Sequence, residues 1–198
     1  NSVTSIGESA FSNCSGLTGM PVCGSNVTNM STTYTNCRNL TGSPVCGDKV
    51  IYFDYTYRYC NNLTGSPACG NNVIEFSYTY GNCYNLTGTP VCGDNVVNME
   101  WTYDNCYNLT GAPICGNNVV SMYYTYSNCY NLAGNSYFFS KNINEVSGCF
   151  RNRNNSKRLN IYVPINSTTE TTVVNSTYIV GKTITYTNAG TYHYNTAY

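Results

Sequence analysis

Residues 83–105 read CYNLTGTPVCGDNVVNMEWTYDN, and this 23-residue pattern recurs along most of the chain. A leucine stands three places after the first cysteine of each unit, and a glycine stands five places after it. Self-similarity at a period of roughly 20 to 50 residues is typical of stacked units that bury their apolar faces only against one another. The pattern therefore predicts a repeat solenoid. Its six units begin at Cys14, Cys37, Cys60, Cys83, Cys106 and Cys129.

Each unit has room for one short strand and one irregular return segment. The stretch from Gly42 to Gly47 reads GSPVCG, so the bounding glycines leave a strand of about three or four residues. Pro44 removes a backbone donor, which a parallel sheet tolerates only where that position faces away from the next strand. The remainder, such as residues 95–103, is rich in Thr and Tyr and predicts extended or 3-10-like turns on the convex side.

The first seventeen residues, NSVTSIGESAFSNCSGL, resemble the BspA-like class of leucine-rich repeats. The matching positions are Val3, Ile6, Gly7, Ala10, Phe11 and Cys14. Later units keep the length but carry Pro-Val-Cys where the family carries I-x-I-P, and Thr-Tyr where it carries Ala-Phe. The resemblance implies a curved, leucine-rich-repeat-like solenoid used for adhesion on bacterial surfaces, on phage particles or by some protists. It implies no catalytic residue.

The chain divides into four predicted parts. Residues 1–13 form an N-terminal partial repeat that acts as a cap, and residues 14–134 form the solenoid. Residues 135–158 form a closing coil and a basic link, which carries Arg151, Arg153, Lys157 and Arg158. Residues 159–198 alternate apolar and polar side chains and predict a small β-rich module. The start without Met and the end at Tyr198 within such a run favour a fragment of a longer protein.

Composition excludes several classes of function. Nine Lys and Arg balance nine Asp and Glu, and charged residues make up only 9% of the chain, which argues against a nucleic-acid partner. No run approaches the roughly eighteen apolar residues of a membrane span, so no membrane insertion is expected. The acids are scattered, the single histidine is His193, and no nucleophile, base and orienting group occur together. We expect neither an enzyme nor a cofactor.

The cysteines follow the repeat. Their gaps alternate between nine and fourteen residues until the last one. Neighbouring units place equivalent cysteines about 4.8 Å apart, a spacing that allows disulfides, buried thiol columns, or a metal or redox role. Buried thiols that act as small apolar fillers are favoured, because free cysteine is among the most buried residue types. Gaps of nine residues and one histidine do not suit a metal site. The predicted structural ladders comprise Cys14, Cys23, Cys37, Cys46, Cys60, Cys69, Cys83, Cys92, Cys106, Cys115 and Cys129, with Leu40, Leu63, Leu86 and Leu109.

Asparagine also recurs at fixed positions of the unit. It stands directly before the first cysteine in most units, as at Asn82 and Asn105, and two places after it, as at Asn85 and Asn108. In stacked turns such side chains can satisfy backbone groups that the turn leaves unpaired. We therefore expect an asparagine ladder.

Aromatic columns are the best candidates for binding. The tyrosines at the family's Phe position, such as Tyr57 and Tyr80, are expected in the core with their hydroxyls reaching the surface. A second stripe lies two residues earlier, where rings can stack on sugars or on apolar protein patches, although plain packing is the alternative. Variable positions near it encode recognition or reflect neutral drift. The candidate ligand-binding residues are Tyr55, Tyr78, Trp101, Tyr124, Tyr84 and Tyr107.

These features predict an extracellular adhesion module that binds a cell-surface glycan or protein, displayed on a bacterial surface or a virion. The alternative is a structural spacer or a fibre subunit that stacks end to end through its open ends or its β module. Near-zero net charge favours such self-association. A third hypothesis, ice binding through a threonine column that includes Thr79 and Thr102, is disfavoured because only one Thr per unit is aligned.

Overall fold

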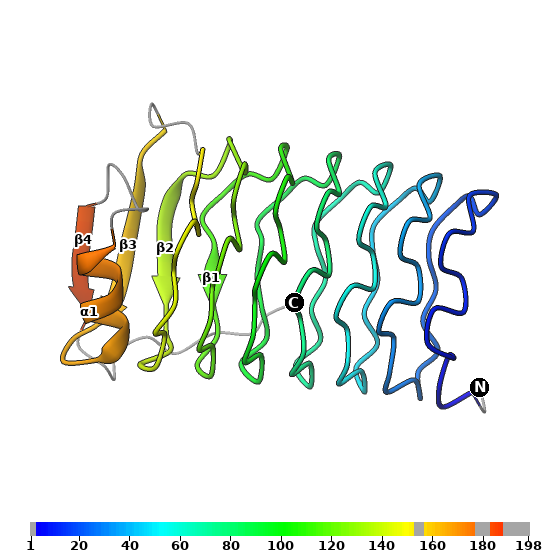
Figure 1. The fold of residues 1–198 in the computed structure, drawn as a ribbon, viewed down its shortest axis with the longest axis horizontal. Helices are drawn as coiled ribbons and strands as arrows, with labels where there is room; N and C mark the ends of the chain where they lie inside the picture. Colours follow the sequence, from blue (N-terminus) through cyan, green and yellow to red (C-terminus); the bar gives the residue numbers. More distant parts are fainter. Residues whose placement is uncertain (1–2, 153–156, 177–182, 188–198) are drawn as a thin grey trace.

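The computed structural model describes residues 3–152, 157–176 and 183–187. Successive 23-residue units, which we call coils, lie side by side along the long axis of the molecule (Figure 1). Backbone hydrogen bonds join corresponding positions of adjacent coils: the N–H of Tyr57 donates to Thr79, and the N–H of Tyr80 donates to Thr102, at 2.9 Å each. Because these coils have the same length, the same backbone hydrogen bonds recur between adjacent coils.

Turns make up most of each coil. From Phe53 to Tyr59 every second N–H donates to the next coil, and from Thr56 to Cys60 the alternate N–H groups donate to the carbonyl three residues back. Two residues other than glycine in each coil, four places apart, take up positive φ, as at Tyr78 (57°) and Asn82 (66°). Because these N–H groups have partners within their own turn or in the next coil, the segment needs no regular helix.

Regular strands occur only toward the C-terminal end of the described residues. Strands β1 (Ile114–Cys115), β2 (Gly134–Phe138), β3 (Leu159–Pro164) and β4 (Thr183–Thr187) form one parallel sheet in the order β1-β2-β3-β4. In earlier coils the described residues make only single parallel bridges, such as Val91 with Ile114. The expected strand of three or four residues is thus two residues long at β1, because the proline and the bounding glycines leave little chain for a ladder.

The C-terminal segment continues this sheet. Strand β3 pairs with β2, with Ile161 opposite Ser136, and β4 pairs with β3, with Ile184 opposite Ile161. The sequence separates a β-rich module at residue 159, but the described part shares one sheet with the preceding coils. Alternation of apolar and polar residues predicts a strand without naming its partner, which explains the difference. Residues 153–156, 177–182 and 188–198 of the predicted link and module lie outside the described residues.

Helix α1 (Thr168–Asn175) joins β3 to β4, and the alternation rule did not anticipate it. Ser167 caps its N-terminus by accepting a hydrogen bond from the N–H of Glu170 at 3.1 Å. Val173 and Thr169 are buried. The eight-residue helix provides the crossover that parallel strands require.

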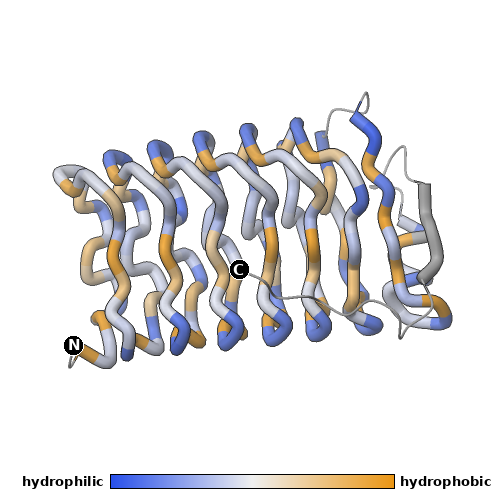
Figure 2. The backbone as a smooth tube through the Cα atoms, turned by 180° about the vertical axis from the view of Figure 1, so that it is seen from behind, coloured by the Kyte–Doolittle hydropathy of each residue, from blue (hydrophilic) through white to orange (hydrophobic). Residues whose placement is uncertain are grey.

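The core is a set of columns that run along the stack. Figure 2 shows hydrophilic residues gathered at the turns where the coils reverse direction, with apolar residues in the runs between them. The predicted leucine column is buried at Leu40, Leu63, Leu86 and Leu109, which expose 2% or less. At the closing coil Phe150 stacks on Tyr126 with the ring centroids 5.3 Å apart, so it continues the aromatic column.

Candidate functional site

Four predicted binding residues form one continuous stack, which we call the aromatic row: Tyr55, Tyr78, Trp101 and Tyr124. Their successive ring centroids lie 4.6, 6.1 and 4.3 Å apart, and the planes differ by no more than 13°. All four side chains are half-buried. One edge of each ring therefore stays available to solvent while its faces pack on neighbours.

The backbone beneath the aromatic row is unusual. The four residues have φ between 52° and 57°, in the left-handed region that favours glycine and asparagine. The corresponding residue of the closing coil is Gly148, at φ 65°. A bulky residue in this conformation costs about 1 kcal/mol or more, so each ring needs a compensating role in stacking or in binding.

A second stack, the tyrosine row, runs beside the first. Tyr84, Tyr107 and Tyr130 have centroids 5.1 and 5.4 Å apart. The hydroxyl of Tyr84 donates to Oδ1 of Asn82 at 3.4 Å, and the hydroxyl of Tyr107 lies 3.5 Å from Oδ1 of Asn105. The asparagine column thus stands between the predicted Tyr84 and Tyr107 and the aromatic row.

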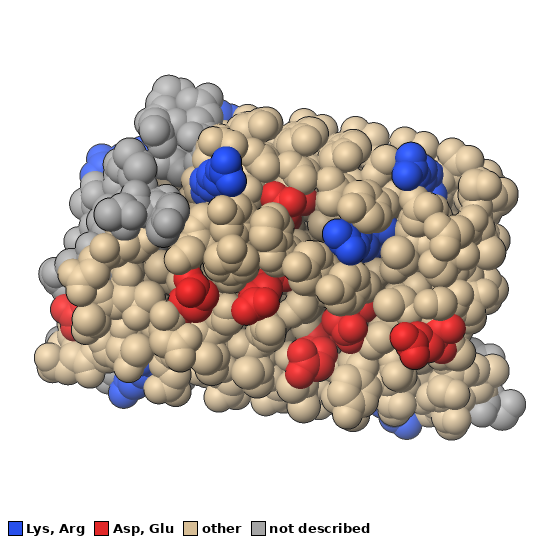
Figure 3. Space-filling view, in the orientation of Figure 1, with Lys and Arg blue, Asp and Glu red and all other residues tan. Residues whose placement is uncertain are grey.

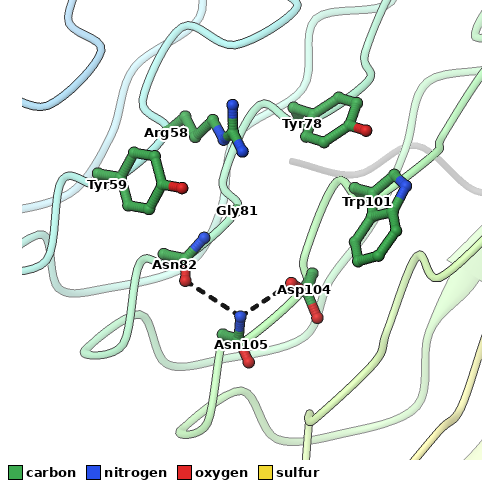
Figure 4. Close-up of a pocket in the computed structure, with 8 residues that line it drawn as sticks. All are labelled: Arg58, Tyr59, Tyr78, Gly81, Asn82, Trp101, Asp104 and Asn105. Atoms are coloured by element: carbon green, nitrogen blue, oxygen red, sulfur yellow. Dashed lines mark hydrogen bonds between the residues drawn. The ribbon is translucent and has the colours of Figure 1, made fainter.

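A pocket of about 380 Å³ opens beside the aromatic row (Figure 4). Two predicted residues, Tyr78 and Trp101, line it, whereas Tyr55, Tyr124 and the tyrosine row do not. Its volume falls within the range of about 300 to 1,000 Å³ that is common for small-ligand sites. The complete lining comprises Arg58, Tyr59, Tyr78, Gly81, Asn82, Trp101, Asp104 and Asn105.

Arg58 forms the cationic side of the pocket. Its guanidinium carbon lies 4.9 Å from the centroid of Tyr78, 4.8 Å from that of Tyr59 and 5.4 Å from that of Tyr55, within cation–π range of each. Its Nε is buried and has no hydrogen-bond partner, and no ion pair to it is found among the described residues. The guanidinium is held by rings and retains its capacity to donate hydrogen bonds.

Asp104 forms the anionic side. Its Oδ2 accepts from Nδ2 of Asn105 at 2.8 Å, and its Oδ1 lies 3.4 Å from Nδ2 of Asn128. Burial raises the pKa of this carboxyl above its ordinary value because it desolvates the charged form, and the hydrogen bonds oppose that rise only in part. The carboxyl is therefore a buried, hydrogen-bonded acceptor on this side of the pocket.

Sequence reasoning missed Arg58, Gly81 and Asp104. They occupy one position of the repeat, which carries Thr35 in the coil before and Ser127 in the coil after. The signal was present, because this position changes from a cation to a glycine to an anion over three successive coils. Only the stacking of the coils shows that the glycine leaves a gap between two opposite charges.

The cysteine ladders are free thiols with hydrogen bonds. All twelve cysteines lie within the described residues, and no disulfide forms among them. In the first column the thiol donates to an aromatic residue's backbone carbonyl in the preceding coil, as from Cys83 to Tyr57 at 3.0 Å. In the second column the thiol accepts from a glycine N–H of the next coil, as from Gly93 to Cys69 at 3.2 Å. The expectation of plain apolar fillers is therefore incomplete, because both columns also satisfy backbone groups.

The tyrosine column that includes Tyr57 and Tyr80 is buried, and its hydroxyls do not reach the surface as expected. Those of Tyr57 and Tyr80 donate to the carbonyls of Val45 and Ala68, at 2.8 and 2.6 Å. The threonine column is also buried, with Thr79 fully covered. This burial contradicts the ice-binding hypothesis, which needs an exposed Thr face.

The asparagine columns make the contacts between coils that stacked turns require. Asn105 donates to Asn82 at 3.0 Å and Asn128 donates to Asn105 at 2.8 Å, side chain to side chain. In the other column Asn108 donates to the carbonyl of Tyr84 at 3.0 Å. One column therefore forms a ladder of side-chain hydrogen bonds, and the side chains of the other column donate to backbone carbonyls of the preceding coil.

Charged groups elsewhere are sparse. On the face seen in Figure 3, acidic side chains gather in a band and basic side chains stand apart from them. Among the described residues no group of three or more His, Cys, Asp or Glu side chains is placed to hold a metal ion, and no helix is long and apolar enough to cross a membrane. Comparison with known proteins found no matching family model, no matching curated protein and no matching solved structure.

Proposed function

We propose that this chain is a non-enzymatic, extracellular adhesion module that binds a cell-surface glycan through the aromatic row and its pocket. The proposal includes a leucine-rich-repeat-like solenoid related to the BspA-like class, displayed on a bacterial surface or on a phage particle. The observation that carries it is four stacked aromatic residues in left-handed backbone conformation beside an open pocket.

Strain and exposure together support binding. The fold accepts glycine or asparagine at positive φ, as at Gly148 and Asn82, and both would relieve the strain of the aromatic row. Sugar rings present apolar C–H faces that can lie against the exposed edges of the stacked rings, and their hydroxyl groups hydrogen-bond to carboxylates and amides. Asn82, Asn105 and Asp104 supply such groups in the pocket that Trp101 lines. This combination suits a glycan better than a flat protein patch.

The test is binding of labelled, monomeric protein to intact gut-type bacteria, to animal cells and to immobilised glycans. A triple variant, Tyr78→Asn with Trp101→Asn and Tyr124→Asn, removes the rings and keeps residues that accept positive φ. The matched control is Tyr162→Ala, which removes a ring stacked on Tyr137 at 4.7 Å outside the pocket. We expect selective binding that the triple variant loses and the control keeps; equal binding by all three proteins would refute the proposal.

The alternative function, an end-to-end fibre subunit or spacer, draws support from the first coil. Val3, Phe11 and Val22 are exposed by 54%, 37% and 71%, and they line a second pocket with Ile6 and Val27. Apolar surface of this kind favours association. Light scattering over a range of concentrations decides: growing polymers that Val22→Asp abolishes support the fibre, and a constant monomer opposes it.

A further inference from the structure

We infer that the pocket between Arg58 and Asp104 is a subsite for a carboxylate-bearing sugar, such as a sialic or uronic acid. This inference rests on the proposed glycan-binding function and names the class of sugar. The carboxylate pairs with the guanidinium of Arg58, the apolar face of the sugar ring lies against the exposed edges of Trp101 and Tyr78, and its hydroxyls donate to Asp104.

The cationic side sets the charge of the ligand. Three rings hold the guanidinium of Arg58, and its buried Nε has no partner. A planar guanidinium presents paired N–H groups that fit a carboxylate in a bidentate manner. Because Asp104 lies two coils away, about 10 Å at the spacing of adjacent strands, it leaves this cation uncompensated. An anionic group at this side of the pocket would compensate it.

Gly81 makes the room. It is the coil residue between Arg58 and Asp104, and its φ is not positive, so its backbone does not require glycine. A Cβ added there would lie 3.4 Å from the carbonyl oxygen of Trp101 and 3.8 Å from Cγ of Arg58, which are ordinary contacts. The missing side chain is therefore no necessity of packing, and its absence leaves room in the pocket between Arg58 and Asp104 (Figure 4).

The opposite side of the pocket accepts hydrogen bonds. Asp104 receives protein hydrogen bonds on both oxygens, yet an ionised carboxylate has about four acceptor positions, so some remain for sugar hydroxyls. The amides of Asn82 and Asn105 lie beside it and are joined to each other at 3.0 Å. A hexose ring with its acid group at Arg58 would present its hydroxyls to this side.

The chain has a built-in probe, because Trp101 is its single tryptophan and lines the pocket. The first experiment follows tryptophan fluorescence during titration with glucuronic acid, N-acetylneuraminic acid, glucose, the methyl ester of glucuronic acid and glucose 6-phosphate at constant ionic strength. We expect saturable changes with one or both acids, and at least about tenfold weaker responses to glucose and to the ester. The stronger of the two acids distinguishes a sialylated from a uronate-bearing source.

Variants locate the binding. Arg58→Gln keeps the stem of the side chain and removes its charge, and Gly81→Thr fills the gap with the residue that the equivalent Thr35 shows the fold accepts. Each should weaken acid binding at least tenfold while the protein still unfolds cooperatively in urea, which shows that the fold is kept. Arg38→Gln is the matched control, because Arg38 is an exposed arginine outside the pocket. It should bind the acid normally.

The results that would overturn the acidic subsite differ from those that would overturn the proposed glycan-binding function. Equal responses to glucuronic acid and glucose, or an unchanged response in Arg58→Gln, would overturn the acidic subsite while leaving glycan binding intact. An equal response to glucose 6-phosphate would show that the pocket reads charge and not a carboxylate. Protein that binds cells through the aromatic row but shows no fluorescence change with any sugar would overturn this subsite alone. Loss of all cell and glycan binding would overturn the proposed function with it.

Discussion

Single residues show where this fold accepts strain. Tyr78 and Trp101 occupy positions at which the backbone favours glycine, and each stacks its ring on both neighbours in the row. The stacking recovers about 0.5–1.5 kcal/mol per aromatic pair, comparable to the cost of the backbone conformation. The aromatic row therefore contributes little net free energy to folding. A ligand that contacts the exposed edges of the rings would give the row its function.

Replacement of Trp101 tests this account of strain. Both Trp101→Ala and Trp101→Gly lose the ring, but only glycine removes the penalty of positive φ. We expect the glycine variant to be more stable than the alanine variant by about 0.5–1 kcal/mol in urea unfolding. At Asn95, where φ is not positive, the same pair of substitutions should give the opposite order. Alanine above glycine at both sites would contradict the assignment.

Asp104 should make stability depend on pH. Its pKa is raised in the folded state, since burial outweighs the hydrogen bonds from Ser127, Asn128 and Asn105 and the attraction of Arg151. The folded protein therefore keeps a proton that the unfolded chain has lost, so stability falls as pH rises from the unfolded pKa of about 3.9 to the raised folded value. Asp104→Asn should remove this fall and be the more stable protein at pH 7, as measured by urea unfolding from pH 3 to pH 8. Parallel curves for both proteins would exclude the effect.

At the scale of the element, each coil is held by columns of side chains that bury apolar surface and also hydrogen-bond backbone carbonyls. Oγ1 of Thr79 lies 2.8 Å from the carbonyl oxygens of Phe53 and of Phe76, so one hydroxyl serves two coils. Leu86 and Cys83 fill the interior beside it. A coil without its neighbours would expose all of these groups, which is why the elements are stable only as a stack.

Substitutions in the leucine column test how much core packing contributes to the stability of a coil. Leu86→Ala removes a fully buried side chain and should cost about 2–5 kcal/mol through lost transfer energy and a cavity. Leu17→Ala, at a half-buried position of the first coil, should cost less. Urea unfolding gives both values. Similar losses at the two positions would mean that burial does not set the contribution of this column.

The thiol columns should resist alkylation in the native state. Burial raises the pKa of Cys46 to about 12 and raises the pKa of Cys83 well above its ordinary value, so little thiolate exists at pH 8. We expect mass spectrometry to find these two unmodified by iodoacetamide in native protein, and all twelve thiols modified in denatured, unreduced protein. Unmodified cysteines after denaturation would reveal disulfides instead.

At the scale of the whole molecule, a coil bonds to the coils next to it, as Tyr57 does to Thr79. A complete 23-residue coil can therefore be deleted and its two neighbours joined. Deletion of residues 70–92 joins Cys69 to Gly93 in register and brings Arg58 next to Asp104 in adjacent coils. Deletion of residues 24–46 joins Cys23 to Gly47 and leaves every residue of the pocket in place. Both products keep a stack of identical architecture with one coil fewer.

The two deletions should differ in function and agree in stability. Each loses one set of contacts between coils, so both should unfold cooperatively with similarly reduced urea m-values. Only the deletion of 70–92 should abolish binding of the acidic sugar, because it closes the gap at Gly81. If both deletions bind, or if neither does, the site is not the one between Arg58 and Asp104.

The sequence by itself determined the period and the columns. Cysteines at alternating gaps of nine and fourteen, with leucine and glycine at fixed offsets, establish which residues are equivalent, since identical local chemistry repeats every 23 positions. From that alone Tyr55, Tyr78, Trp101 and Tyr124 could be grouped as one aromatic row before any coordinates. The same period predicts the solenoid class, whereas its leucine-rich-repeat-like form and the role in adhesion follow the family resemblance, and all three remain proposals.

Tertiary structure alone decided which way each column faces and what lies across a gap. The hydroxyl of Thr79 turns inward because two carbonyls need a donor there, a demand that no pattern of hydropathy expresses. The segment after Leu159 joins the sheet because β2 offers it an edge. Arg58, Gly81 and Asp104 follow one another at steps of 23 residues in the chain, and they line one pocket only when their coils stack. The reason is that a binding site depends on distances in space and not on separation in sequence.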